Sequence, residues 1–294
     1  MEERDWLANR FEEHRIHLRG VAYRMLGSLS EADDAVQEAW LRLSRADVGA
    51  VENLRAWLTT VIARVCLNQL RSRGTRREQP LGPHVPDPVV QREDGVDPEH
   101  EALLAESVGL ALLVVLDELA PAERLAFVLH DSFGVSFEEI AAMVGRTPEA
   151  ARQLASRARR RVRNAAPVPD PDLARQREVV SAFFAATRAG DLGALVALLD
   201  PDVVLRADGG TARADVSIVA RGPRAVAEHS LGFAAMTPFV RPALVNGAAG
   251  AVVAPHGQPF SVMGFTVTGG KIVAIDALVD PERLRRLDLS ELEE

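Results

Sequence analysis

Residues 136–163 contain the strongest structural signal in the chain, two short helical patterns separated by a glycine turn. Ser136 and Glu139 have the spacing of a capping box, which predicts the start of the first helix. Gly145 is expected to end that helix, because glycine readily takes the left-handed conformation found there. Thr147 then follows as the N-cap of the second helix. Two helices joined by so short a turn predict a helix-turn-helix, a unit that binds DNA.

The second of these helices is predicted to have two chemically different faces. On a helical wheel the small and apolar residues gather on one side, as if to pack on a core: Ala151, Leu154, Ala155, Ala158 and Val162. The opposite side is basic and polar and consists of Arg152, Gln153, Ser156, Arg157 and Arg160. Arginine pairs with guanine and phosphate, and glutamine pairs with adenine, so this side suits a major groove. A merely solvated arginine face is the alternative.

Composition limits the class of protein. The formal net charge is −8, but residues 146–163 hold seven arginines against one acid, and residues 64–77 hold five arginines and no acid. Phosphates respond to local charge within about 8–10 Å, so these segments permit nucleic-acid binding despite the acidic total. No apolar run reaches the roughly 18 residues of a membrane span, and the acidic start is no signal peptide. We therefore expect a cytoplasmic, soluble protein without a membrane partner.

The chain divides into segments separated by proline-rich breaks. Residues 1–79 have the helical spacing of apolar side chains, residues 80–98 hold five prolines, and residues 99–166 return to a helical pattern. Residues 172–294 begin with helix and continue with short strand patterns, which suggests a bent sheet around a cavity. We predict a multidomain fold with two all-α domains, an extended linker and a C-terminal α+β cone. The expected strands are residues 203–206, 216–220, 240–245, 251–254, 260–267 and 272–277, with a helix at about 223–235.

Two helices of the first segment have polar faces of opposite character. The second helix is expected to begin with a capping box at Ser30–Asp33. Its outer face holds Asp33, Asp34, Gln37 and Glu38 and is predicted to meet a protein or water, since acids do not approach phosphates. The third helix, at about residues 52–72, aligns Trp57, Thr60, Arg64, Asn68 and Arg71. A ring, an amide and arginines together are typical of a surface that binds a single strand, although Trp57 is equally consistent with a helix–helix core.

Several longer segments carry a recognisable family pattern. They are SLSEADDAVQEAWLRL, NLRAWLTTVIARVCLNQLRSR and LDELAPAERLAFVLHDSFGVSFEEIAAMVGRTPEAARQLASRARRRVR. Together they resemble regions 2 and 4 of an extracytoplasmic-function (ECF) RNA polymerase sigma factor of the sigma-70 family, in the right order with a linker between. The later segments GDLGALVALLDPDVVLRADGG and GGKIVAIDALVDPERLRRL resemble the SnoaL-like domain that is fused to one subgroup of this family.

The resemblance implies partners and residue roles. Region 2, in residues 1–79, would bind the β′ clamp helices of core RNA polymerase through Asp33, Asp34, Gln37, Glu38 and Leu41. It would contact and open the −10 element of promoter DNA through Trp57, Arg64, Asn68, Arg71 and Arg73. The loop around Asp47–Glu52 would hold a flipped base. Region 4, in residues 99–166, would bind the β flap and read the −35 element through Arg146, Arg152, Gln153, Ser156, Arg157 and Arg160.

Three short motifs of the subgroup recur with departures. The linker keeps the frame of a Gly-Pro-Trp-Leu-Pro-Glu-Pro motif at Gly82–Pro88 but lacks its Trp. An Asp-Gly-Gly-Gly motif appears as Asp208–Thr211, and an Asn-Pro-Asp-Lys-Leu motif appears as Asp280–Leu284. The resemblance implies that the fused domain regulates the factor in place of an anti-sigma factor. The residues implied in this interdomain regulation are Pro83, Pro86, Asp87, Pro88, Asp208, Gly209, Gly210, Asp280, Pro281 and Leu284.

The C-terminal cone leaves other functions open. SnoaL-like cones include cyclases and isomerases, and the candidate acids and bases are Asp208, His229, His256 and Asp276. A general base needs geometry and a tuned pKa, which the sequence does not supply, so we expect no enzyme. A retained pocket for a small ligand is a stronger alternative, and a homodimeric repressor is a further one. Cys66 is the only cysteine, which excludes a disulfide framework or thiolate metal cluster, and we expect no cofactor or metal site.

Overall fold

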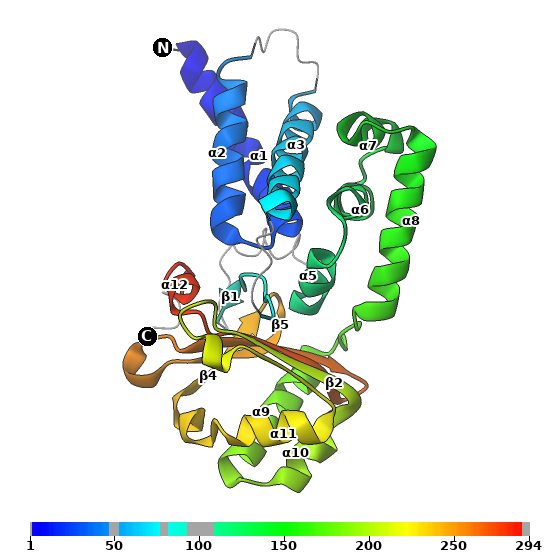
Figure 1. Cartoon of the computed structure of the whole chain (residues 1–294). Helices are drawn as coiled ribbons and strands as arrows, with labels where there is room; N and C mark the ends of the chain where they lie inside the picture. Colours follow the sequence, from blue (N-terminus) through cyan, green and yellow to red (C-terminus); the bar gives the residue numbers. More distant parts are fainter. Residues whose placement is uncertain (1, 47–52, 77–81, 93–108, 290–294) are drawn as a thin grey trace. The chain divides into compact units, whose positions relative to one another are not determined.

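The protein separates into two compact units (Figure 1). The computed structural model describes residues 2–46, 53–76, 82–92 and 109–289. The helical unit comprises residues 1–79, 97–107 and 115–165, and the sheet unit comprises residues 80–96, 108–114 and 166–294. No helix in the described ranges combines the length and hydropathy needed to cross a bilayer.

Three long helices form a bundle in the helical unit: α1 (Glu2–Leu26), α2 (Leu29–Leu43) and α3 (Leu54–Arg76). Their apolar sides meet in a core in which Leu18, Ala35 and Ile62 are fully buried. The capping box expected at Ser30 is wrong, because Ser28 is the N-cap of α2 and its side chain makes no capping bond. The hydroxyls of Ser28 and Ser30 instead lie 3.2 Å apart and hydrogen-bond to each other.

The second half of the helical unit contains the predicted helix-turn-helix. Its elements are α6 (Pro121–Phe127), the π-helical segment η2 (Val128–Ser132), α7 (Phe137–Val144) and α8 (Pro148–Ala165). They are preceded by α5 (Leu110–Asp117), whose first residues belong to the sheet unit and whose last residues belong to the helical unit. The capping box is confirmed, since Ser136 Oγ accepts from Glu139 N and the Glu139 carboxylate accepts from Ser136 N. Gly145 has φ 68° and ends α7, and Thr147 Oγ1 accepts from Ala150 N at 3.2 Å.

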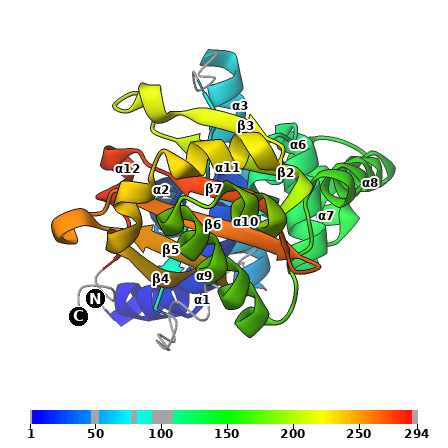
Figure 2. The ribbon, with the colours of Figure 1, turned by 90° about the horizontal axis from the view of Figure 1, so that it is seen from below.

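The sheet unit is built on a seven-stranded sheet in the order β1-β4-β5-β6-β7-β2-β3. Only the β2–β7 pair is parallel. The strands are β1 (Val90–Gln91), β2 (Leu199–Asp208), β3 (Ile218–Arg221), β4 (Val240–Val245), β5 (Ala248–Val253), β6 (Ser261–Thr268) and β7 (Lys271–Leu278). The helices α9 (Leu173–Ala189), α10 (Leu192–Leu198) and α11 (Pro223–Leu231) cover one face of the sheet (Figure 2). Each expected strand is found, and the predicted α+β cone is confirmed.

The core of the sheet unit lies between this face and the helices. The rings of Phe183 on α9 and Phe265 on β6 meet with centroids 5.4 Å apart. Leu205, Val226 and Ile275 complete the contact from β2, α11 and β7 and are almost wholly buried. Burial of such side chains contributes about 1.5–3 kcal/mol each, so the two helices are held firmly on the sheet.

Linker residues 82–92 belong to the sheet unit and pack against its C-terminal part. The strand β1 pairs with β4 and forms one edge of the sheet, and β3 forms the other. Val89 N donates to Asn246 Oδ1 at 3.1 Å, and Asn246 N donates to Val89 O at 2.8 Å. The sequence predicts an extended linker, and this segment is extended, but its apolar side chains give it surface to bury. The buried residues are Val85, Pro86, Asp87, Pro88, Val89, Val90 and Gln91, while Pro83 is partly buried.

Candidate nucleic-acid interface

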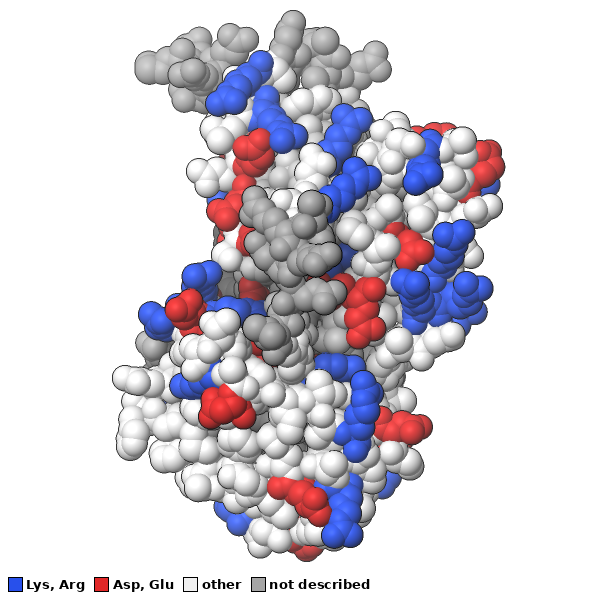
Figure 3. Space-filling view, in the orientation of Figure 1, with Lys and Arg blue, Asp and Glu red and all other residues white. Residues whose placement is uncertain are grey.

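Helix α8 presents a basic and polar face to solvent. Ala151, Ala155 and Ala158 on its other side are fully buried, which confirms the two-faced helix expected from the sequence. Figure 3 shows basic side chains gathered over this helix. The side chains expected to read DNA are all exposed: Arg146, Arg152, Gln153, Ser156, Arg157 and Arg160.

The arginines of α8 divide into paired and unpaired ones. Arg159 Nε lies 2.6 Å from Asp131, and Arg161 Nη1 lies 3.0 Å from Glu123. These two side chains join α8 to the preceding helices, and carboxylates compensate their charge. Arg157 is exposed and forms no ion pair with the described residues. Its charge therefore remains fully available to a phosphate or a base.

Helix α3 exposes a second row of polar side chains. Three expected −10 contacts lie along it: Arg64, Asn68 and Arg71. Trp57 is partly buried. Its exposure is therefore intermediate between that of the surface position and that of the core position, the two alternatives that the sequence left open. Arg73 points to α2, where it pairs with Glu31 and donates to Leu26 O at 3.4 Å. Arg73 thus has a role within the bundle that its sequence spacing did not indicate. The expected base-holding loop at Asp47–Glu52 lies outside the described residues.

The acidic face of α2 is exposed, as predicted. Asp33 accepts from Arg19 at 2.7 Å, and Glu38 accepts from Arg42 at 2.9 Å. Leu41 is 39% exposed on the same helix. A groove between α1 and α2 runs beside this face, and its lining includes Asp34, Val36, Gln37 and Trp40.

The three-helix bundle and the helix-turn-helix pack on each other inside the helical unit. Arg124 of α6 is 1% exposed; its Nε donates to Arg24 O at 3.1 Å and its Nη1 to Asp117 at 2.8 Å. The Phe133 ring meets His17 edge-on at 5.1 Å and lies 4.8 Å from the Arg24 guanidinium. Burial lowers the pKa of Arg124, and the Asp117 carboxylate opposes that effect. Sequence reasoning missed this contact, because arginine at helical spacing is normally exposed.

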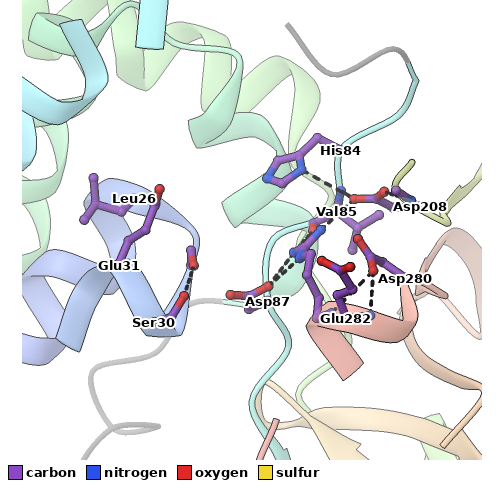
Figure 4. Close-up of polar contacts among 12 residues, drawn as sticks. Leu26, Ser30, Glu31, His84, Val85, Asp87, Asp208, Asp280 and Glu282 are labelled. Atoms are coloured by element: carbon purple, nitrogen blue, oxygen red, sulfur yellow. Dashed lines mark hydrogen bonds and ion pairs between the residues drawn. The ribbon is translucent and has the colours of Figure 1, made fainter. Parts of the chain in front are cut away.

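A second polar cluster joins the linker to the sheet unit (Figure 4). Arg283, in α12 (Pro281–Leu284), contacts Asp87 of the linker at 2.5 Å and Asp208 of β2 at 2.7 Å. Arg283 also donates to Val85 O at 2.6 Å, and Val85 N donates to Asp208 at 3.0 Å. We call Val85, Asp87, Asp208 and Arg283 the Arg283 cluster. It unites three motifs that are far apart in the sequence.

The electrostatic environment keeps Asp208 ionised. Burial alone would raise the pKa of this carboxyl group. A hydrogen bond with His84, backbone donors from Val85 and Gly210 and the charge of Arg283 outweigh burial and hold the pKa below its usual value. The bond from Gly210 N closes a tight turn after β2, as the sequence indicated.

The two glycines after Asp208 leave room for this arrangement. A Cβ atom at Gly209 would collide with the backbone carbonyl of Arg213. Gly210 has φ 59°, and a Cβ there would collide with the Asp280 carboxylate. Asp280 N-caps α12 and thereby orients the helix that carries the central arginine of the cluster. The buried side chain of Leu284 anchors the same helix from its other end.

The candidate acids and bases of the cone do not meet in one site. Asp276 pairs with Arg206 at 3.1 Å, where burial raises the pKa of Asp276 and the arginine opposes that rise. Asp208 belongs to the Arg283 cluster. His229 lines a cavity, whereas His256 is exposed. These four groups form no acid–base pair within the described part of the chain.

Comparisons with known proteins cover nearly the whole chain. The family model for Sigma-70 region 2 matches residues 10–76, and the model for Sigma-70 region 4 matches residues 109–162. The ECF RNA polymerase sigma factor SigJ of Mycobacterium tuberculosis is 40% identical over 96% of this chain and 94% of its own length. The probable ECF sigma factor SigI of the same organism is 36% identical over 97% of each chain. The crystal structure of Mycobacterium tuberculosis SigJ matches with a TM-score of 0.76 and 36% identity, over 96% of this chain and 99% of that one.

Proposed function

Because the chain belongs to the family of ECF RNA polymerase sigma factors, we propose that its basic faces bind promoter DNA and its acidic face binds core RNA polymerase. Members of this family direct transcription initiation with RNA polymerase at promoters. The proposal assigns each part of that task to one described surface.

The exposed face of α8 is proposed to read the −35 element. The observation that carries this assignment is the burial of the three alanines behind five exposed polar side chains of α8, with Arg146 exposed just before the helix. Arg152 is partly ordered in advance, because its guanidinium lies over the Phe137 ring at 5.1 Å. An arginine already placed by a ring loses less conformational entropy when it pairs with a guanine.

The faces of α3 and α2 are proposed to bind the −10 element and the polymerase. Arg64, Asn68 and Arg71 supply positive charge and an amide along one side of α3, which suits a DNA strand. The acidic side of α2 would repel phosphates, and it lies beside the groove and the exposed Leu41. The charge difference supports separate partners for the two helices.

We infer that the helical unit opens when the factor binds a promoter. Elements at −35 and −10 lie roughly 80 Å apart along straight B-DNA at 3.4 Å per base pair. A compact unit of this size has a radius of gyration of about 14 Å. The bundle and the helix-turn-helix therefore cannot reach both elements while they are joined at Arg124 and Phe133.

The Arg283 cluster is proposed to regulate this opening in place of an anti-sigma factor. The linker connects the two DNA-binding parts of the chain. Its attachment to the sheet unit by Arg283 and by β1–β4 pairing restricts the positions that these parts can reach. Loss of the attachment should therefore favour promoter binding.

Transcription by purified core polymerase on a cognate promoter tests both proposals with full-length proteins. Without promoter-dependent initiation by the wild type, the assignment of the DNA-binding and polymerase-binding faces fails. Arg283→Gln is expected to raise initiation severalfold over wild type, since it breaks the cluster. The matched control is Arg286→Gln, an exposed position just after α12. Equal initiation by wild type and Arg283→Gln would refute the regulatory role of the linker. It would leave the assignment of the DNA-binding and polymerase-binding faces intact.

A further inference from the structure

Helix α7 begins with an aromatic side chain that lies outside the core of the helix-turn-helix. Phe137 is the first residue of α7 and is only partly buried. The capping box at Ser136 fixes the backbone of this first turn. The core side of the helix consists of other residues, Ile140, Ala141, Met143 and Val144, which are all buried. The Phe137 ring is thus held at the surface, where it can contact side chains of other elements.

Two side chains from other elements lie on the Phe137 ring. The His130 imidazole of η2 stacks on it, with ring centroids 4.0 Å apart and planes inclined by 25°. The Arg152 guanidinium of α8 lies over the same ring, 5.1 Å from its centroid. A guanidinium over an aromatic ring is attracted by the negative charge of the ring face. Phe137 therefore connects η2 with the basic face of α8.

The His130 side chain is itself held in place. Its Nδ1 lies 3.0 Å from Val135 O, and because a carbonyl oxygen only accepts, Nδ1 carries a proton and donates it. The next residue, Asp131, pairs with Arg159 of α8 at 2.6 Å and so fixes η2 against that helix. The imidazole is thereby oriented from two sides, and it restricts the positions that the Phe137 ring can take.

The ring is the one contact that places the Arg152 guanidinium within the described part of the chain. Arg152 is exposed, and it forms no ion pair and no side-chain hydrogen bond with the described residues. Glu149 lies one turn earlier on α8 and is the single acid among residues 146–163. Its carboxylate is the alternative group that could orient Arg152, and a variant at this position separates the two explanations.

We propose that Phe137 and His130 are positioning residues that orient Arg152 toward one base pair of the −35 element. The proposal rests on the proposed role of α8 in reading that element. A bidentate contact of arginine with guanine depends on the orientation of the guanidinium, whereas a contact with phosphate depends mainly on its charge. The stack therefore contributes to discrimination between sequences more than to affinity for DNA in general.

Binding of the holoenzyme to promoter DNA tests this assignment. The full-length chain with core polymerase is bound to a cognate promoter and to promoters in which single −35 base pairs are changed. The base pair that Arg152 reads is the one at which Arg152→Ala no longer discriminates. Phe137→Leu should reduce discrimination at that base pair about threefold and leave the other base pairs unaffected. Unchanged discrimination there, or an equal loss at every base pair, would overturn the proposal.

Further variants separate the ring from the packing around it. Phe137→Tyr keeps an aromatic ring and should match wild type. His130→Ala removes the stacked imidazole and should reduce discrimination at the same base pair by a smaller factor, and an unchanged value would exclude His130. Phe137→Leu should add little to the loss caused by Arg152→Ala, but its loss should add fully to that of Arg157→Ala. Full addition with Arg152→Ala would contradict the proposed coupling.

Glu149→Gln is the matched control for Phe137→Leu. It removes the acid of α8 and leaves the ring in place, so discrimination at the base pair read by Arg152 should stay unchanged. A loss in Glu149→Gln that equals or exceeds the loss in Phe137→Leu would assign the orientation of Arg152 to the carboxylate and overturn the proposal.

A measurement without DNA distinguishes the positioning role from the role of α8 itself. Protons that lie over an aromatic ring resonate upfield, so NMR of the free full-length protein should show upfield-shifted side-chain protons of Arg152. Phe137→Leu should abolish this shift. If Arg152→Ala discriminates as wild type does at every base pair, the proposed reading of the −35 element by Arg152 fails, and the positioning role falls with it. If Arg152→Ala is selective but the upfield shift is absent from wild type, only the positioning role is refuted.

Discussion

The Arg124 side chain donates a hydrogen bond to the backbone carbonyl of Arg24, 3.1 Å away, and so joins the helix-turn-helix to the three-helix bundle. The acceptor is a main-chain group, so the contact depends on the residue at position 124 rather than on the one at 24. Asp117 compensates the buried charge at 2.8 Å, but Arg124 Nη2 has no hydrogen-bond partner among the described residues. A buried arginine with one unpaired nitrogen stabilises this contact less than a fully satisfied polar network would.

Replacement of Arg124 by methionine should weaken the packing of the two helical parts. The change leaves Arg24 O and Asp117 without their partner, at a cost of about 1–3 kcal/mol in the free energy of unfolding. Urea unfolding measures this, with Arg157→Met as the control, because Arg157 is exposed and forms no ion pair with the described residues. A variant as stable as wild type would mean that apolar packing alone joins the two parts.

The Cys66 thiol should report on the same interface. Burial raises its pKa to about 12, and the nearby charge of Arg124 opposes the rise. The thiolate is the reactive form, so native protein should not react with a disulfide reagent at pH 8, and Arg124→Met should react faster. Reaction of native wild type at the rate of unfolded protein would contradict this account.

The raised pKa of Cys66 also predicts a loss of stability in alkali. Its folded pKa of about 12 lies above the ordinary thiol pKa of 9.0, so the folded state binds more protons between these limits. The stabilising contribution is complete below pH 9 and is lost as the pH rises toward 12. Between pH 8 and 10.5, wild type should lose about 2 kcal/mol more than Cys66→Val in urea unfolding. Parallel losses would show that the thiol is not responsible.

Asp208 should hold the linker in its carboxylate form. Its pKa is lowered in the folded protein, so its contribution is present above pH 3.8 and is lost as the pH falls through the folded value. Asp208→Asn should remove most of the hydrogen-exchange protection of residues 84–91 at pH 7, and wild type should keep that protection at pH 5. Asp202→Asn, at an exposed position of β2, is the control. If Asp208→Asn kept full protection of these residues, the Asp208 carboxylate would not be what holds the linker in place.

Arg152 and Arg157 should contribute sequence-specific contacts. Alanine at either position is expected to cost about 1–3 kcal/mol on the cognate −35 sequence and much less on random DNA. Arg161→Ala serves as the control, because Glu123 already pairs with that side chain. Equal losses on both DNAs would reduce Arg152 and Arg157 to phosphate contacts.

The acidic face of α2 should decide polymerase affinity. Asp34→Arg reverses an exposed charge and should weaken binding to core polymerase about tenfold, since a wrong charge at an interface typically costs more than 1 kcal/mol. Asp202→Arg makes the same change in the sheet unit and should bind normally. Fluorescence anisotropy of labelled protein measures the affinity of both variants for core polymerase. A normal affinity of Asp34→Arg would show that this face does not bind the polymerase.

Local signals predicted local structure well, and long-range contacts were not predictable from them. The capping box at Ser136, the turn at Gly145 and the short strand-like runs all depend on near neighbours. The start of α2 was misplaced because Ser28 and Ser30 are equally good N-cap residues by type. Burial of Arg124 and pairing of Val90 with Val245 depend on residues distant in the chain, for which one sequence carries no spacing signal. The motif residues Asp87 and Asp208 were identified, but their common partner Arg283 was not.

The edge strand β1 comes from the segment that the proposed regulation requires to move. When β1 leaves, β4 becomes an open edge whose free backbone groups can pair with any extended chain. The two residue pairs between β1 and β4 therefore also act as a safeguard against self-association. A form in which the linker stays free for long is therefore expected to be prone to aggregate through β4.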